Sequence, residues 1–305
     1  MMLTSNEIIR NAWKARTAVP AFNIPYVPMM EPIISALRDT NCFGFVAVAR
    51  LEWMKFGAGS LRKIYNEYQL LKDERFTRLH LDHVPVIDED NQFVDYETII
   101  AEALDTGYNS VMIDGSRLPL DENIAATKKI VNLAHAKGIA VEGELGSVLG
   151  HEERTLPPYE EIFTSGKGFT APNEAKRFVK ETNVDWLSIA IGNIHGAISK
   201  AKKSEKKVSA MLSIGQLDAI RHAANIPFVL HGGTGIQKQY VLQAIKHGIA
   251  KINIGMATRQ PYETNISFSV KQAQKAVYDA AIKVIKDDLE LEGTVKIINS
   301  IKNSG

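Results

Sequence analysis

The chain has 305 residues, of which 45% are hydrophobic and 23% charged, and its formal net charge is +1. This balance is ordinary for a globular protein and creates no strong field for nucleic acid or an anionic membrane, so we expect neither as a partner. Cys42 is the only cysteine, which excludes an internal disulfide and a cysteine-based zinc cluster. The sequence has no apolar run of about 18 residues and no signal-peptide pattern, which predicts a cytoplasmic protein.

Short apolar runs alternate with helical patterns along the chain. After a helix at 4–14, we expect strands at 18–23, 43–49, 78–83, 110–114, 139–144, 186–191, 227–231 and 251–254. Between them we expect helices at 29–38, 58–71, 96–104, 121–137, 173–181, 214–223 and 237–247, and further helical residues follow from about 262. Residues 146–168 form a long segment with Gly and Pro, which is typical of a functional loop. No linker divides the chain, so we expect one domain over 1–305.

Polar side chains recur at or just after the C-terminal ends of the predicted strands. They are Asn23, Asp82, His83, Asp114, Glu144, His195, His231 and Asn253. A doubly wound sheet would concentrate such residues at its switch point, whereas a (β/α)8 barrel gathers them around one rim. The pattern therefore predicts a TIM barrel with extra helices at the C-terminus.

Three residues of this rim are histidines: His83, His195 and His231. Three imidazoles without a cysteine suit a catalytic Zn²⁺ that keeps one position open, although Co²⁺ and Fe²⁺ also accept imidazole. A single histidine is more often a core or surface residue than a ligand. We interpret the others in that way, namely His80, His135, His151, His222 and His247.

Acidic residues accompany the histidines. Asp82 is suited to moving a proton beside a cation, or alternatively to orienting a histidine. Glu144, and also Glu142, can bind a metal or pair with a lysine. Glu152 lies in the long segment, where a mobile base is expected, although loop acids are usually solvated.

Glycine-rich turns follow the last two predicted strands. Gly232, Gly233 and Thr234 come after His231, and Gly255 follows Asn253 closely. Backbone N–H groups in such turns bind phosphate at this position of a barrel, although a plain tight turn is the alternative. The lysine-rich run at 202–207 is interpreted as a solvated loop.

Several motifs together resemble the class II ketose-bisphosphate aldolases and the related aldolase of inositol breakdown. They are LHLDH at 79–83, SVMIDGS at 110–116, DENI at 121–124, EGELG at 142–146, AIGNIHG at 190–196, VLHGGTGI at 229–236 and KINIG at 251–255. The resemblance spans nearly the whole chain. It implies a TIM barrel with zinc at the three rim histidines, and it leaves room for a monovalent cation.

The resemblance also implies roles for single residues. Asp114 and Glu144 match an alternative or second metal position. Asp82 matches the acid that exchanges a proton with the hydroxyl at the cleaved bond, and Glu152 matches the loop acid acting at the donor carbon. Gly196, with the glycine turns and the stretch from Asn253, matches the cradle for dihydroxyacetone phosphate, and Asn23 is expected to contact substrate. Relatives pair through peripheral helices, so a homodimer or homotetramer is expected.

The chain departs from the family pattern around the substrate. Ala47 and Ala49 replace a Gln and a Ser, Met256 replaces a Thr near the phosphate, and the Asp-Pro-Arg segment near the C-terminus is missing. Arg50 is a candidate to bind an anionic group instead. We expect a metal-dependent aldolase that cleaves a phosphorylated ketose, such as fructose or tagatose 1,6-bisphosphate, into dihydroxyacetone phosphate and an aldehyde. The alternatives are a metal-bearing sugar-phosphate binder without turnover and a metal-free barrel isomerase.

Overall fold

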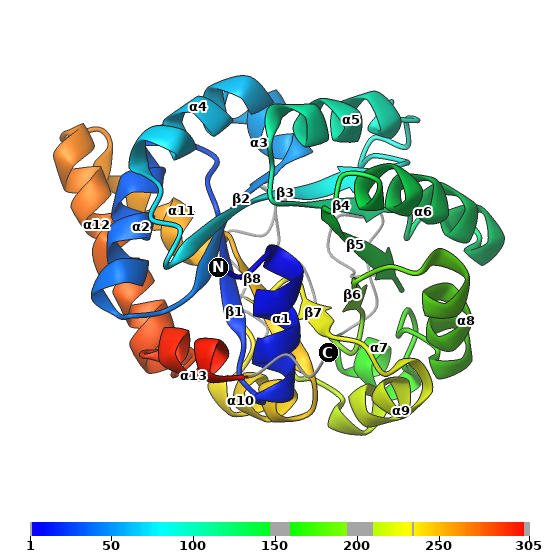
Figure 1. The fold of residues 1–305 in the computed structure, drawn as a ribbon. Helices are drawn as coiled ribbons and strands as arrows, with labels where there is room; N and C mark the ends of the chain where they lie inside the picture. Colours follow the sequence, from blue (N-terminus) through cyan, green and yellow to red (C-terminus); the bar gives the residue numbers. More distant parts are fainter. Residues whose placement is uncertain (1, 147–158, 194–209, 234, 302–305) are drawn as a thin grey trace.

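Eight parallel strands form a closed barrel in chain order, which confirms the predicted TIM barrel. The computed structural model describes residues 2–146, 159–193, 210–233 and 235–301. The strands are β1 Val19–Asn23, β2 Gly44–Ala49, β3 Thr77–Pro85, β4 Ser110–Asp114, β5 Ala140–Leu145, β6 Trp186–Ile189, β7 Phe228–Leu230 and β8 Ile249–Ile254. Figure 1 shows the barrel with its ring of helices.

The helices surround the barrel and close one of its ends. They are α1 Ser5–Lys14, α2 Met30–Asp39, α3 Arg50–Lys55, α4 Leu61–Leu71, α5 Tyr96–Thr106, α6 Leu120–His135, α7 Tyr159–Ser165, α8 Pro172–Thr182, α9 Ile214–Ala224, α10 Lys238–Lys246, α11 Met256–Asn265, α12 Val270–Lys283 and α13 Thr294–Ser300. The last three are the expected extra C-terminal helices, and α12 packs beside α2 (Figure 1). Within the described residues no helix is long and apolar enough to cross a membrane.

Two apolar layers explain why these segments fold as they do. The larger layer fills the space between the strands and the surrounding helices. The smaller layer fills the inside of the barrel at the end that α1 covers, where Phe45, Trp186 and Val229 pack with Ile8 and Ile9 of α1. Because α1 lies across this end of the barrel (Figure 1), functional side chains are left to the opposite end, where the strands terminate.

Several element boundaries differ from the prediction. The strand expected to end at His83 continues to Pro85, because a bulge between Leu81 and Val84 lets β3 pair further with β4. Two short helices, α3 and α7, were missed, since six or seven residues carry too little periodicity to be seen. Helix α11 begins at Met256 instead of about 262, because it accommodates Pro261, a residue that usually ends a helix.

Candidate metal centre and proton-transfer site

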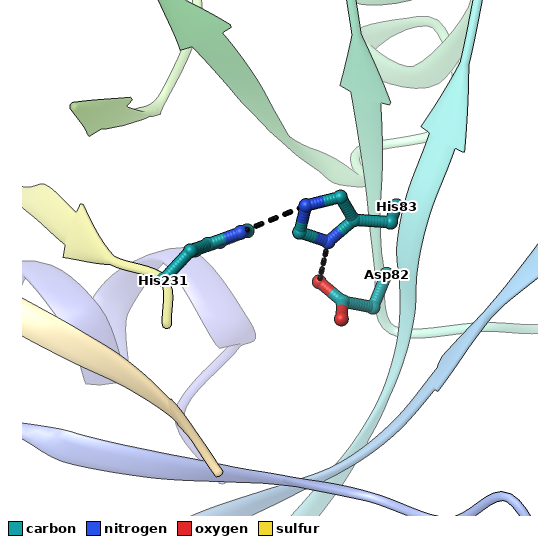
Figure 2. A group of neighbouring side chains, drawn as sticks. All are labelled: Asp82, His83 and His231. Atoms are coloured by element: carbon teal, nitrogen blue, oxygen red, sulfur yellow. Dashed lines mark hydrogen bonds and ion pairs between the residues drawn. The ribbon is translucent and has the colours of Figure 1, made fainter. Parts of the chain in front are cut away.

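The end of β3 supplies two functional side chains in succession. Neighbouring residues of a regular strand point to opposite faces, but the bulge at this place and the φ of +29° at His83 break the alternation. Asp82 and His83 consequently lie side by side, with Oδ1 of Asp82 3.4 Å from Nδ1 of His83 (Figure 2). The other ring nitrogen of His83 therefore faces away from Asp82.

His231 faces His83 from the other side of the barrel. It follows β7 directly, its side chain is 1% exposed, and its Nδ1 lies 3.1 Å from Nε2 of His83 (Figure 2). The prediction that these two imidazoles converge is confirmed, and this convergence argues against the metal-free isomerase hypothesis. His195, the third predicted ligand, lies outside the described residues.

Glu144 brings a carboxylate oxygen to the same point. Its Oε2 lies 3.5 Å from Nε2 of His83 and 3.8 Å from Nδ1 of His231. Ligands of a tetrahedral Zn²⁺ are about 3.3 Å apart, so these three donor atoms fit a single cation. Oε2 of Glu144 is buried and has no hydrogen-bond partner among the described residues, as expected for an atom that binds a cation.

Asp114 extends this donor set. One of its oxygens lies within 4.8 Å of donor atoms of His83 and Glu144, and Oδ1 accepts from the backbone N–H and the hydroxyl of Ser116. Burial and the charge of Asp114 hold the pKa of Glu144 well above its usual range. Two carboxylates this close are unfavourable without a positive charge between them, which again favours a bound cation.

Asp82 is held in place by two amides. Asn23 Nδ2 donates to its Oδ2 at 2.8 Å, and Asn253 Nδ2 donates to its Oδ1 at 2.9 Å. Burial would raise the pKa of Asp82, but His83, Lys251 and His231 together hold it well below the usual value. The side chain is therefore an ionised, oriented carboxylate that can accept a proton.

Glu142 and Lys251 lie beneath these residues, and both are fully buried. Oε1 of Glu142 accepts from Nε2 of His231 at 2.7 Å, and its Oε2 lies 2.8 Å from Nζ of Lys251. The sequence left two roles open for Glu142, metal binding or pairing with a lysine, and the structure shows the pair with a lysine. Lys251 itself was missed, although a lysine inside an apolar strand run is a signal of a buried partner.

The predicted phosphate turns lie where the barrel prediction placed them. Gly232, with a φ of +66°, and Gly233 follow β7, and Gly255 follows β8. A Cβ on Gly233 would approach Cγ2 of Ile252 to 3.3 Å, so this turn packs closely against β8. Asn253, also assigned to this group, directs its amide to Asp82 and Lys251.

Arg50 lies on the same rim as the first residue of α3, directly after β2. Its side chain is 17% exposed, and its Nη1 lies 3.4 Å from Oδ2 of Asp88. Glu152, Gly196 and Thr234 complete the predicted site residues, and all three lie outside the part of the chain that the structure describes.

The remaining histidines of the described residues have ordinary partners. His80 is buried and its Nδ1 pairs with the hydroxyl of Ser110 at 2.9 Å. His135 pairs with Asp185 at 2.8 Å, and His247 pairs with Asp218 at 2.8 Å near the surface. His222 contacts the backbone carbonyl of Asp218. The other ring nitrogen of His80, Nε2, lies 3.6 Å from Oε2 of Glu142 and 3.8 Å from Oδ1 of Asp82, so the interpretation of His80 as a core residue stays a prediction. His151 lies outside the described residues.

The chain resembles known proteins in both sequence and fold. Residues 3–300 match the family described as "Fructose-bisphosphate aldolase class-II". A "Fructose-bisphosphate aldolase" of Geobacillus stearothermophilus is 31% identical over 257 residues, covering 83% of this chain and 80% of the relative. One of Staphylococcus aureus is 31% identical over 288 residues, covering 91% and 89%. The crystal structure of the YdjI aldolase from Escherichia coli K12 superposes with a TM-score of 0.75 at 25% identity, over 97% of this chain and 100% of that one.

Proposed function

Because the chain belongs to the class II fructose-bisphosphate aldolase family, we propose that it cleaves a phosphorylated ketose reversibly into dihydroxyacetone phosphate and an aldehyde. One observation carries the proposal: donor atoms of His83, His231 and Glu144 converge beside the ionised Asp82. Fructose or tagatose 1,6-bisphosphate is the proposed type of substrate, and the name of the relatives, "Fructose-bisphosphate aldolase", supports the fructose compound.

The ligands of the cation are proposed to be His83, His231 and Glu144, with His195 as a further imidazole and Asp114 at an alternative position. When bound, a divalent ion of the zinc class supplies Lewis-acid polarisation of the ketose carbonyl. Zn²⁺ is the proposed metal, and Co²⁺, Fe²⁺ or an added monovalent cation are further expectations of the family resemblance.

Asp82 is proposed to move the proton of the reaction. In the cleavage direction its carboxylate takes the proton from the hydroxyl on the carbon that becomes the aldehyde, and the carbon–carbon bond then breaks. In the reverse direction Asp82 returns this proton. The two amide donors, from Asn23 and Asn253, limit rotation of the carboxylate and so keep one of its oxygens directed at the substrate hydroxyl. Glu152 is proposed to exchange the proton at the donor carbon.

The two ends of the substrate are proposed to bind at different parts of the rim. Backbone N–H groups at Gly232, Gly233 and Gly255, together with Gly196 and Thr234, would bind the donor phosphate.

Arg50 would bind an anionic group on the aldehyde half. Asp88 is its only polar partner among the described residues, and the other oxygen of Asp88 already accepts from two loop N–H groups. Most donors of this guanidinium are thus left for a ligand.

The proposal is tested with metal-loaded protein and a panel of ketose phosphates, with triose phosphate release as the readout. We expect release from at least one ketose, and a loss of about 10²-fold or more in kcat for Asp82→Asn, which keeps the shape but cannot take the proton. Bound metal, measured by elemental analysis, should be unchanged in this variant. Full activity after complete chelation, or in Asp82→Asn, would contradict the proposal.

A binder without turnover is the second candidate, since Ala47 and Ala49 leave the β2 side of the site without the polar groups expected there. Ala47 is fully buried and Ala49 is 9% exposed. The same panel decides, because tight binding of a ketose phosphate without any release would favour this candidate. Assembly into a homodimer or homotetramer and a cytoplasmic location also remain predictions.

A further inference from the structure

Lys251 connects the metal centre to the proton-transfer carboxylate through the interior of the barrel. It comes from the middle of β8 and is 0% exposed. Its Nζ lies 2.8 Å from Oε2 of Glu142 and donates to Oδ1 of Asn253 at 2.7 Å. A buried ammonium group is unfavourable unless it is paired and hydrogen-bonded, and these two contacts meet that requirement. Two chains of contacts start from this one group.

The first chain leads to the metal centre. With Oε2 directed to Lys251, the other oxygen of Glu142 accepts from Nε2 of His231 at 2.7 Å. A carboxylate only accepts hydrogen bonds, so the ring proton of His231 is placed on Nε2. Nδ1 is then unprotonated, and it is this atom that faces Nε2 of His83 and Oε2 of Glu144.

The second chain leads to Asp82. Because Lys251 can only donate, the amide of Asn253 must turn its oxygen toward Lys251 and its NH₂ group the other way. Nδ2 consequently donates to Oδ1 of Asp82 at 2.9 Å. A reversed amide would place an oxygen against the carboxylate, so the orientation of Asn253 decides whether Asp82 is held or repelled.

Building on the proposed function, we propose that Lys251 is a positioning residue that fixes the direction of hydrogen bonding in both chains. Its donor-only ammonium group makes Glu142 accept from His231, and it makes Asn253 donate to Asp82. One side chain thereby prepares Nδ1 of His231 to bind the cation and Asp82 to take the proton. Lys251 itself contacts neither the cation nor the substrate.

The first variant is Lys251→Met, which keeps an unbranched side chain and removes the donors. Without the ammonium group, nothing directs Oε2 of Glu142 toward β8, so the carboxylate can turn and its hydrogen bond from Nε2 of His231 is no longer fixed. We expect the affinity for Co²⁺ to fall about 10- to 100-fold, as measured by competition with a chelator and by the visible absorption of bound Co²⁺. We also expect kcat at saturating metal to fall, since Asn253 is free to turn.

The decisive comparison uses Glu142→Gln alone and combined with Lys251→Met. In Glu142→Gln, Lys251 and His231 both require the single amide oxygen, so Co²⁺ affinity should fall at least about tenfold. In the double variant no lysine competes, and the glutamine oxygen can accept from His231. We expect its Co²⁺ affinity to return to within about threefold of the original protein, while kcat stays low because Asn253 still lacks its partner.

Asn253→Ala separates the two chains, since it removes the donor to Asp82 and leaves Glu142 in place. We expect a lower kcat with Co²⁺ affinity changed by less than about twofold. Losses of metal affinity that multiply in the double variant would overturn the inference, and so would an unchanged affinity in both single variants. If Lys251→Met does not fold, Glu142→Gln and the charge-free double variant still give this comparison. The affinity measurements need no substrate, so a failure of the proposed reaction can be distinguished from a failure of this inference.

Discussion

Nε2 of His83 and Nδ1 of His231 lie 3.1 Å apart, although 148 positions separate the two residues in the chain. At this distance only one proton or one cation fits between the rings. Burial would lower the pKa of His83, but the carboxylates of Asp82, Glu144 and Asp114 raise it well above the usual value. In the metal-free protein the proton therefore occupies the place that a metal would take.

Metal binding should consequently strengthen as the pH rises. Below the raised pKa of His83 each bound ion must displace at least one proton, and the raised pKa of Glu144 adds to this, so we expect the affinity for Zn²⁺ to increase at least about tenfold per pH unit between pH 6 and 8. Competition titrations at fixed ionic strength measure this slope, and proton release in weak buffer counts the protons independently. A flat profile without proton release would show that His83 is not a ligand.

Glu52 should make the protein less stable as the pH rises. This buried carboxyl accepts from the backbone N–H of Ala49, and burial together with nearby Asp82 raises its pKa to about 8. In the unfolded chain it ionises near pH 4.5, so the free energy of unfolding should fall by about 3–4 kcal/mol from pH 5 to 8 and then level off. Urea unfolding across this range measures the effect.

Glu52→Gln serves as the control, because the amide oxygen can still accept from Ala49 but does not ionise. The difference in stability between this variant and the original protein should grow with pH up to about 8. A constant difference would mean that Glu52 is already ionised in the folded protein at pH 5.

Arg50→Met should change substrate preference more than turnover. If Arg50 binds an anionic group of the aldehyde half, its loss removes a charge-assisted hydrogen bond worth about 1.5–3 kcal/mol. We expect KM for an anionic aldehyde to rise about 10- to 100-fold in the condensation direction, with little change for a neutral aldehyde. Lys55→Met is the matched control, because Lys55 lies on the same helix and pairs with Glu89 at 2.7 Å. Equal changes for both aldehydes would argue against the role.

Gly232→Ala should weaken binding of the phosphorylated donor. Its φ of +66° lies in the left-handed region, where a Cβ costs about 1–2 kcal/mol, so the turn should shift and misplace its N–H groups. KM for dihydroxyacetone phosphate should rise about tenfold. Gly138→Ala provides the control, since Gly138 has a φ of +69° and precedes β5 at the opposite end of the barrel. Gly138→Ala should lose a similar amount of stability and keep its KM for dihydroxyacetone phosphate. An unaltered KM in Gly232→Ala would exclude this turn from phosphate binding.

The barrel and the convergence of His83 with His231 could be predicted because both follow from strand ends. Parallel strands in one barrel bring their C-terminal residues to one rim, so the position of a polar residue in the sequence gives its place in space. The bulge at Asp82 and His83 could not be predicted, since it depends on pairing with β4. Lys251 and Glu142 were missed as a pair because their contact joins β5 to β8 across the interior, which no local pattern reports.

The bulge in β3 also bears on how this enzyme family changes substrates. His83, a proposed ligand, and Asp82, the proposed base, are neighbours in the chain. A single peptide unit therefore fixes their separation, even when the loops around the site change in sequence. Replacements on other elements, such as Ala47 and Ala49 on β2 and Met256 at the start of α11, can then reshape the walls around the sugar while the reacting centre keeps its dimensions. Selection can thus alter which ketose is accepted without having to rebuild the chemistry.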